Sequence, residues 1–378
     1  MYLYDSSNID TLVWPDTEQG KKARDYLLPL VSNDIQNYIS NAKTSFYILA
    51  IDDLVLPVTV NAREYDNSYV VSNYYAIPLL EEKMAKRQSW YNRLKKPFIR
   101  LGGRLLKSMR INKVVMVNNW LVSTSVQPEL SASQINNITT FLQGAFSDHL
   151  IMFRNVNGLK ESGLCRDLSA EKFHLFGTRM VYVYDPSLKE TLSSKVHYHH
   201  RRDKRLIEKN SYEIFTDADL TPEDIPRLLE LYSAVYIGKY TSYSPKYTEK
   251  FLMNALGQRV WRFMGVRREG KIDGVFGYFV HNGIMIVPFF GHDTNFPPQL
   301  GLYRMLTILI IQESERLGVL LNDSSGAEAP KKYRGMKPHP EYTAIYTRHL
   351  PLVRQLFWKG AATIHNRAIF PRVRRSHS

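Results

Sequence analysis

The most constraining feature of the sequence is a hairpin signal followed by one apolar helix and a short apolar strand. Asn282-Gly283 separates the β-prone runs 274–280 and 284–290, and Asn-Gly is the strongest short signal for a two-residue hairpin turn. Residues 300–317 then predict an apolar helix, and 319–321 predict a buried strand. Because a strand–helix–strand crossover makes its two strands parallel, we expect an antiparallel meander that leads into one parallel pair.

The other predicted elements surround this core pattern. Thr221-Pro222 is a helix start, with Thr as the cap and Pro at the first helical position. Residues 135–145 repeat apolar side chains at helical spacing after a helix start near Pro128. The remaining strands are predicted where β-prone runs recur, at residues 44–51, 113–117, 150–153, 179–184, 260–267, 272–280 and 341–346.

The first half of the chain echoes the second at an offset of 168 residues. Residues 151–155 fall on 319–323, and the strand Met116-Val117 falls on the strand that begins at Ile284. Apolar helix positions coincide between these strands, and Gly158 falls on Gly326. The recurring order of strand, loop, helix, strand and glycine favours a duplicated fold with a junction near residues 205–215.

Chain length and cysteine content narrow the class of protein. A chain of 378 residues suits two domains. The single cysteine, Cys165, excludes an internal disulfide framework and a zinc site of several thiolates, and no base is indicated that would make it a nucleophile. The first residues lack the pattern of a secretory signal, so we expect a cytoplasmic protein, peripheral at the inner membrane face if it docks on lipid.

Positive charge is concentrated in two segments. The chain has 50 basic and 36 acidic residues, a formal net charge of +14. Residues 83–113 contain 11 basic residues and 354–378 contain six, and neither segment contains an acid. The rest of the chain then has 33 basic residues against 36 acidic ones, which is close to neutral. The charge is therefore a property of two segments and not of the whole protein.

Both segments interleave basic with aromatic and aliphatic side chains, such as Trp90 and Phe98 in the first and Trp358 and Phe370 in the second. This composition is typical of an interfacial membrane helix and also suits phosphate-rich RNA. The alternative is a structural role, in which each segment is a helix whose charged face lies in solvent and whose apolar side packs on its own domain. Because Pro97 and Gly102-Gly103 interrupt the first segment, we expect them to break it.

A polar, basic helix over 197–209 is expected to connect the two halves. His197, His199 and His200 invite comparison with a metal site, but no neighbouring residues supply the remaining ligands, so no metal is predicted.

The order of elements from Thr221 to His349 resembles the GCN5-related N-acetyltransferase (GNAT) superfamily, and two such domains in tandem resemble the Fem-type aminoacyl transferases. The motifs that carry the resemblance are Gly301-Leu302-Tyr303-Arg304, residues 321–327 and residues 331–335, which look like a Fem-type run near the end of the chain. Residues 118–124 look like a first-domain segment of related bacterial proteins.

The resemblance implies a mixed α/β fold (α+β) of two tandem GNAT-like domains, each a mixed, mostly antiparallel sheet with flanking helices. We expect an N-terminal degenerate domain over 1–210, with 83–113 as a basic insertion. The catalytic domain would cover 211–378 and end in a basic tail. Its reaction centre would lie where strand 284–290 diverges from strand 319–321.

Four residues near this point are candidate catalytic groups. His292 has a side chain suited to general-base work, or it is a structural loop histidine. Asp323 could orient an amine, or it is a turn carboxylate. Lys331, which matches a Fem-motif lysine, could neutralise an oxyanion or phosphate, or it is a surface lysine. Tyr333 could return a proton to a thiolate, or it belongs to the core.

The co-substrate is expected to bind at the strand end and at the start of the apolar helix. The backbone of Phe290 and Gly291 is a candidate oxyanion donor, and the helix start near Gln299 would present N–H groups to phosphates. Tyr303 is assigned to packing and Arg304 to phosphate contact. The usual GNAT pyrophosphate loop is degenerate here, because only Gln299 and Gly301 remain of its pattern.

The predicted function is transfer of an acyl group from a thioester, on coenzyme A or an acyl-carrier protein, to an amine. The amine would belong to a small molecule or a peptide. The first alternative is an aminoacyl-tRNA-dependent transferase of the Fem type, and the second is a non-catalytic acyl- or lipid-binding module at the membrane. Segments 83–113 and 354–378 would contact an anionic membrane, a carrier protein or tRNA. No DNA partner and no bound cofactor are predicted.

Overall fold

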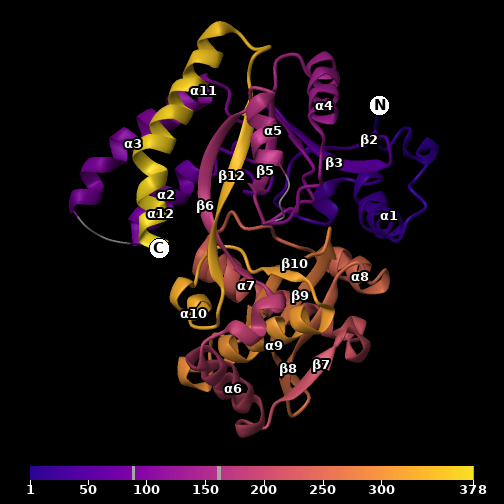
Figure 1. Cartoon of the computed structure of the whole chain (residues 1–378), viewed down its shortest axis with the longest axis vertical. Helices are drawn as coiled ribbons and strands as arrows, with labels where there is room; N and C mark the ends of the chain where they lie inside the picture. Colours follow the sequence, from indigo (N-terminus) through magenta and orange to yellow (C-terminus); the bar gives the residue numbers. More distant parts are fainter. Residues whose placement is uncertain (87–89, 160–162, 378) are drawn as a thin grey trace. The chain divides into compact units, whose positions relative to one another are not determined.

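The computed structural model describes residues 1–86, 90–159 and 163–377 (Figure 1). Arg87 and the side chains of Trp90 and Arg93 lie outside what the structure describes. The chain divides into two compact units. Unit 1 contains Met1–Thr178, Thr241–Lys246 and Tyr342–Pro371, and unit 2 contains Arg179–Tyr240, Tyr247–Glu341 and Arg372–Ser378. The expected boundary at residue 210 remains a prediction about folding domains, and the two units are described separately below.

Unit 1 is a mixed sheet whose strands pair mostly antiparallel. Its first five strands are neighbours in chain order: β1 (Tyr2–Tyr4), β2 (Ser45–Ile51), β3 (Leu54–Asn61), β4 (Val114–Val117) and β5 (Leu150–Asn157). The pairs from β1 to β4 are antiparallel, whereas β4 and β5 are parallel. A helix between β4 and β5 makes the crossover that a parallel pair requires.

Helices cover both faces of this sheet. They are α1 (Glu18–Val31), α2 (Ala76–Lys86), α3 (Trp90–Ser108), α4 (Ala132–Ala145), α5 (Leu164–Ala170) and α11 (Leu352–Ile364). Alternate residues of β4 face opposite sides, as the two-residue period of a strand requires. Val115 and Val117 join a core cluster with α4 and α5, and Val114 and Met116 join a second cluster that includes Trp358 of α11.

Helix α3 corrects one expectation about the basic segment. Pro97 and Gly102-Gly103 do not end it, because α3 runs without interruption from Trp90 to Ser108. Close packing explains the second glycine. A Cβ atom at Gly103 would lie 2.9 Å from Tyr74 Oη and 3.2 Å from Ile77 Cγ2, so a glycine lets the helix approach α2. The segment is divided instead between α2 and α3.

Unit 2 contains the predicted hairpin and crossover. Its strands β7 (Glu213–Thr216), β8 (Arg262–Arg268), β9 (Lys271–His281) and β10 (Ile284–His292) are successive antiparallel neighbours, and β10 pairs in parallel with β11 (Leu320–Asn322). The helices are α6 (Ser194–Lys209), α7 (Ile225–Ser233), α8 (Glu249–Gly257), α9 (Leu302–Leu317) and α10 (Glu328–Lys332), with a π-helical turn η6 (Ala234–Tyr240) after α7. A last helix, α12 (Phe370–His377), ends the chain.

The sheet of unit 2 lies between two helical layers. On one face α9 and α6 enclose a core cluster with Phe276 of β9 and Met285 of β10. On the other face, Phe289 of β10 stacks on Tyr232 of α7 with ring centroids 4.7 Å apart. The predicted mixed α/β fold with flanking helices is therefore confirmed.

Each five-strand series is continued by a strand from the other half of the sequence. The neighbour of β5 is β12 (Lys337–Tyr346), and the neighbour of β11 is β6 (His174–Tyr184). In unit 2, β6 is antiparallel to β11 through the pairs Leu321↔Tyr184 and Asn322↔Val183. The two halves thus exchange the strand that follows their parallel pair.

The parallel strand pairs of the two units have the same register at the offset of 168 residues. Met116 pairs with Met152 in unit 1, and Ile284 pairs with Leu320 in unit 2. Both residues of the second pair lie 168 positions after those of the first. The intervening helices α4 and α9 also correspond. The same strand–helix–strand unit therefore occurs twice.

Candidate functional site

Strands β10 and β11 diverge inside unit 2. Their parallel pairing covers only Ile284–Ile286, and β11 ends at Asn322 while β10 continues to His292. Opposite β9, strand β10 has one extra residue between Ile286 and Phe289, which is a β-bulge. Pro288 lies in this bulge and has no backbone N–H to donate. The divergence predicted from sequence is thus present, and it begins at a bulge.

Asp323 lies directly after β11 and is held by its backbone and its side chain. Its N–H donates to the carbonyl of Tyr182 on β6 over 2.9 Å. Its carboxylate is 3.2 Å from the ammonium of Lys331. Burial raises the pKa of Asp323, and the charge of Lys331 acts in the opposite direction. The neighbouring β6 strand therefore determines where this carboxylate points.

Lys331 is buried, with 5% of the residue exposed, and its ammonium is surrounded by the loop after β11. Nζ donates to the carbonyl of Asp323, and it lies 3.4 Å from the carbonyl oxygens of Ser324 and Ser325. It also lies 5.8 Å from the centroid of the Tyr182 ring. Because these contacts occupy its donors, Lys331 stabilises the loop that presents Asp323 and is not a surface lysine.

Two tyrosines lie within electrostatic reach of Asp323. Burial and then the Asp323 carboxylate raise the pKa of Tyr303, in the first turn of α9. The same two causes raise the pKa of Tyr240, at the end of η6. The ring of Tyr303 meets that of Phe290 edge to face at 5.7 Å. Both hydroxyls therefore stay protonated at neutral pH, and Tyr303 links Asp323 to the end of β10.

His292 is half-buried at the end of β10. Its ring centroid is 6.1 Å from that of Phe290, and its Nδ1 lies 3.5 Å from the carbonyl of Asp293. Burial lowers the pKa of His292, and the positive charge of Lys239 lowers it further. The imidazole is therefore neutral at pH 7 and can accept a proton.

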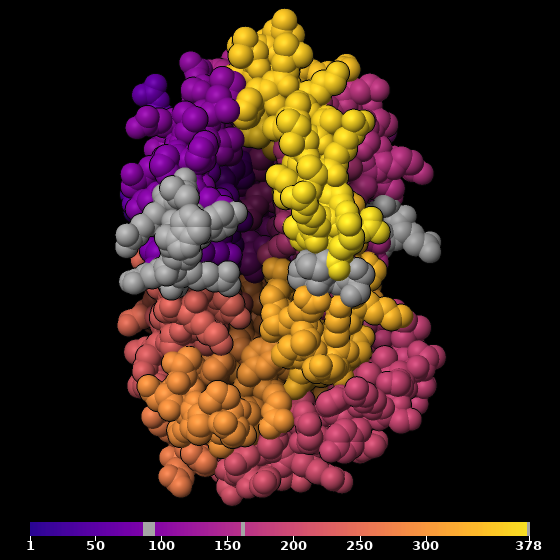
Figure 2. Space-filling model, turned by 90° about the vertical axis from the view of Figure 1, so that its left-hand side faces the viewer, coloured from indigo at the N-terminus to yellow at the C-terminus, as the bar shows by residue number. Residues whose placement is uncertain are grey.

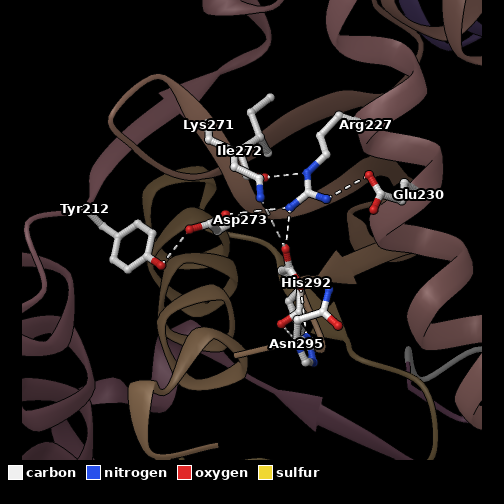
Figure 3. A network of polar contacts seen from close by, with 9 residues as sticks. Tyr212, Arg227, Glu230, Lys271, Ile272, Asp273, His292 and Asn295 are labelled. Carbon is white, nitrogen blue, oxygen red and sulfur yellow. Dashed lines mark hydrogen bonds and ion pairs between the residues drawn. The ribbon is translucent and has the colours of Figure 1, made fainter. Parts of the chain in front are cut away.

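Asp293 belongs to a structural network that anchors the end of β10 (Figure 3). Arg227 of α7 donates to Asp293 over 2.7 Å, to Glu230 over 2.8 Å and to the carbonyl of Ile272 over 2.9 Å. The third carboxylate of the network, Asp273, accepts from the Tyr212 hydroxyl over 2.8 Å. Asp293 is almost fully buried and paired with Arg227, so it fixes the end of β10 next to His292.

Gly291 is required by packing. A Cβ atom there would lie 2.5 Å from the carbonyl carbon of Leu231 and 2.5 Å from the nitrogen of Tyr232, both backbone atoms of α7. This close approach brings α7 against the end of β10. The donor role predicted for the backbone of Phe290 and Gly291 stays a prediction.

Gly301 begins helix α9 in the left-handed region, with φ of +84°, where a glycine is favoured. Its carbonyl accepts from the N–H groups of Arg304 and Met305, which starts the helix. A Cβ atom at Gly301 would lie 2.8 Å from Leu206 of α6. Gln299 is exposed in the short 3-10 turn before it. Helix α6 thus packs directly on the start of α9, next to the predicted phosphate site.

Arg304 points to a carboxylate of the protein itself. Its guanidinium lies 3.8 Å from Asp203, a fully buried residue of α6 that also accepts from Arg334. Arg334 donates in addition to the carbonyl of Pro330 over 2.6 Å. Asp203 therefore ties together α6, the start of α9 and the end of α10.

Tyr333 lies apart from the Asp323 group. It is half-exposed, its ring stacks on His199 of α6 with centroids 5.6 Å apart, and Lys195 Nζ lies over the same ring, 5.8 Å from its centroid. Of the predicted catalytic residues, Asp323 and Lys331 are in contact, and His292 is connected to them through Phe290 and Tyr303. The structure does not bring Tyr333 into this group by any of these contacts.

Sequence reasoning missed three residues of the site. Tyr240 ends a π-helical turn, and no motif predicts that such a turn faces Asp323. Asp203 is the one acid in the basic run 201–205, and a single acid among basic residues was a usable signal. Arg334 belonged to the quoted motif but received no role, although its position one turn after Pro330 placed it beside Lys331.

The histidines of α6 contact other residues of unit 2, and Cys165 lies in unit 1. His200 contacts the carbonyl of Arg334 over 3.0 Å, and His199 stacks on Tyr333. In the part of the chain that the structure describes, no group of three or more potential ligand side chains could hold a metal ion. Burial raises the pKa of the Cys165 thiol, which lowers its reactivity.

The comparisons with known proteins agree with this architecture. Residues 194–333 match the family model of the acetyltransferase (GNAT) domain. A conserved protein of unknown function from Bacteroides thetaiotaomicron VPI-5482 is 13% identical, with a TM-score of 0.52 over 91% of this chain and 98% of that chain. FemX is 9% identical, with a TM-score of 0.50 over 95% of this chain and 100% of that chain. No curated protein matches.

At sequence identities of 13% and 9%, the similarity to these solved structures supports the fold alone. Residues 194–333 match the GNAT domain, and the chain has the tandem GNAT-like fold that the sequence predicted, a fold similar to that of FemX.

Proposed function

We propose that unit 2 is an N-acyltransferase that transfers an acyl group from a thioester to an amine. The observation that supports this most directly is the grouping of Asp323 and Tyr303 beside the divergence of β10 from β11, within the segment that matches the GNAT domain. A carboxylate and a protonated phenol in one place can serve the two ends of an acyl transfer.

In the proposed reaction, the amine nitrogen attacks the thioester carbonyl, a C–N bond forms and the C–S bond breaks. The amine loses a proton to the Asp323 carboxylate or to neutral His292, and the thiolate that leaves accepts a hydrogen bond from the Tyr303 hydroxyl; the protonated base then releases its proton to solvent. Because burial and the Asp323 carboxylate raise the pKa of Tyr303, the hydroxyl stays protonated and acts as a hydrogen-bond donor to the leaving sulfur. Lys331 is a positioning residue, since it holds the loop that carries Asp323.

The donor is proposed to be an acyl-CoA or an acyl-carrier protein, with no bound cofactor. The left-handed Gly301 and the first turn of α9 provide the backbone N–H groups that could receive a phosphate. Asp203 lies close to this point, but it is paired with Arg304 and Arg334, so its negative charge is neutralised and does not exclude a phosphate there.

An aminoacyl-tRNA donor is the second candidate, and helix α6 is the observation that favours it. Five basic side chains of α6 are exposed on the unit that carries the site: Lys195, Arg201, Lys204, Arg205 and Lys209. A basic helix face of this kind suits a polyanion.

Purified protein should be incubated with labelled acyl-CoA, acyl-carrier protein or aminoacyl-tRNA and a panel of amines. We expect amide formation from a thioester, a drop of about a hundredfold in kcat for Asp323→Asn and Tyr303→Phe, and little change for Tyr333→Phe, which serves as the matched phenol control. Transfer from charged tRNA alone would replace the first candidate by the second. Unchanged kcat in both site variants would show that the site is wrongly assigned.

A further inference from the structure

Helix α3 of unit 1 has an apolar stripe on each of two faces. One face packs inward through Gly103 and Leu106. The other carries Phe98, Leu101 and Leu105, which are 75%, 63% and 49% exposed. Spacing of three and four residues places these side chains in one row along a helix. A helix that is already anchored on its own domain thus keeps a second apolar row in solvent.

Helix α11 has the same construction. It buries Arg354, Trp358 and Ala362 at four-residue intervals. The other side exposes Leu352, Val353, Leu356 and Ile364, and Val353 is 67% exposed.

These rows are an unusual concentration of exposed apolar surface. In the described part of the chain, nine of the eighteen exposed large hydrophobic side chains lie on α2, α3, α11 and the π-helical turn that follows α11. They are Leu80, Phe98, Leu101, Leu105, Leu352, Val353, Leu356, Ile364 and Ile369. Figure 2 shows α3 (purple) and α11 (yellow) on the same side of unit 1. Single exposed hydrophobics are ordinary, whereas a shared face of them indicates an interaction surface.

Basic side chains accompany both rows, and acids are absent from them. Between Lys95 and Ser108, and again between Leu352 and Ile369, the sequence contains no Asp or Glu. Lys96 and Arg104 are exposed on α3. Lys359 is exposed on α11, and Arg367 is exposed in the π-helical turn that follows α11. A partner of this face must therefore accept apolar side chains and carry negative charge.

We propose that the face formed by α3 and α11, here called the α3/α11 face, docks unit 1 on an anionic lipid membrane. Leucine, phenylalanine and isoleucine side chains would enter the boundary between headgroups and acyl chains, while lysine and arginine would contact lipid phosphates. An RNA partner would use the same charges but would leave the apolar rows in water. In the described residues no helix is long and apolar enough to cross a membrane, so attachment would lie in the interface plane.

The test is co-sedimentation of the full chain with vesicles of phosphatidylcholine, with and without phosphatidylglycerol. We expect binding to the anionic vesicles that falls steeply with salt. The double variant Leu101→Ser/Leu105→Ser should weaken binding about tenfold, because two apolar side chains no longer leave water. Leu352→Ser/Leu356→Ser, on the other helix, should have a similar effect.

The matched control is Ile214→Ser/Met253→Ser, which removes two side chains of similar exposure, 49% and 54%, from unit 2. This control should bind as the parent chain does, and all variants should keep the parent's thermal unfolding midpoint.

Charge reversal tests the part played by the basic side chains, whereas the leucine variants separate a membrane from RNA. Lys96→Glu/Arg104→Glu should weaken binding to anionic vesicles at least tenfold. If the parent chain binds both vesicle types equally or neither, or if the control loses as much as Leu101→Ser/Leu105→Ser, the proposal is wrong. It is equally wrong if the charge-reversal variant loses tRNA binding while the parent chain has no affinity for anionic vesicles.

Discussion

At the scale of single residues, the site depends on buried charges whose partners come from distant parts of the sequence. Asp323 faces Lys331 eight positions later, but its backbone is held by Tyr182 on β6. Asp203 pairs with Arg334, which is 131 positions away. Such pairs cost much to break, because removing one partner leaves the other buried and unpaired.

Lys331→Met tests this directly. The substitution leaves the Asp323 carboxylate and the carbonyls of the loop without their donor, so we expect a loss of about 3 kcal/mol in the free energy of unfolding. Lys332→Met is the control on the adjacent residue. Its ion pair with Glu328, at 3.0 Å, is partly exposed and should contribute about 0.5 kcal/mol. Urea unfolding measures both, and equal losses would contradict a structural role for Lys331.

A histidine in unit 1 predicts how stability depends on pH. Burial, followed by the charge of Lys113, lowers the pKa of His149 from 6.5 to about 4, and Arg354 and His349 act in the same direction while Asp148 opposes them. Between pH 6.5 and 4 the unfolded chain therefore binds more protons than the folded one at this site. The contribution is full above pH 6.5 and is lost as the pH falls towards 4.

His149→Gln should remove up to about 3 kcal/mol of that acid-dependent loss. The measurement is the free energy of unfolding at pH 7 and at pH 4.5 for both chains. A difference between the two pH values that is the same in the variant and the parent would show that His149 is not responsible.

At the scale of elements, the spacing between α7 and β10 rests on Gly291. We expect Gly291→Ala to destabilise the protein by about 3 kcal/mol, since its Cβ would meet backbone atoms of Leu231 and Tyr232 that cannot rotate away. Gly257→Ala, in α8, is the control, because its Cβ would have no atom within 4 Å. Thermal unfolding compares the two, and a parent-like midpoint for Gly291→Ala would refute the argument.

Turn residues and hydrophobic periodicity predicted several elements correctly. The Asn282-Gly283 hairpin, the helix after Gly301 and the parallel pair are present as expected. The prediction failed for Pro97 and Gly102-Gly103, where helix α3 continues. Packing of Gly103 on Tyr74 stabilises what local propensity disfavours, and local sequence carries no information about that neighbour.

At the scale of the whole molecule, the two halves are interdependent because each supplies a strand to the other's series. A chain ending at residue 210 lacks β12, which neighbours β5, and a chain beginning at residue 211 lacks β6, which neighbours β11. Either fragment would leave a sheet edge and an apolar face uncovered.

We therefore expect neither 1–210 nor 211–378 to unfold cooperatively when it is expressed alone. A chain shortened to 1–371 keeps every strand and should unfold like the parent. Circular dichroism and thermal unfolding of the three chains decide the matter. A cooperative transition in either half would mean that the exchanged strand is dispensable for folding.

The sequence by itself determined the kinds of elements, their order and their duplication, because strand and helix periods and turn residues act over a few positions. It also placed His292 at the end of one strand, and Asp323 and Lys331 after the strand that pairs with it. Tertiary structure alone decided the strand exchange, the burial of Lys331 and the approach of Tyr240 and Tyr303 to Asp323. These depend on which surfaces meet after the chain has folded back on itself, and the free energy of burial and pairing that selects them is shared between residues more than a hundred positions apart.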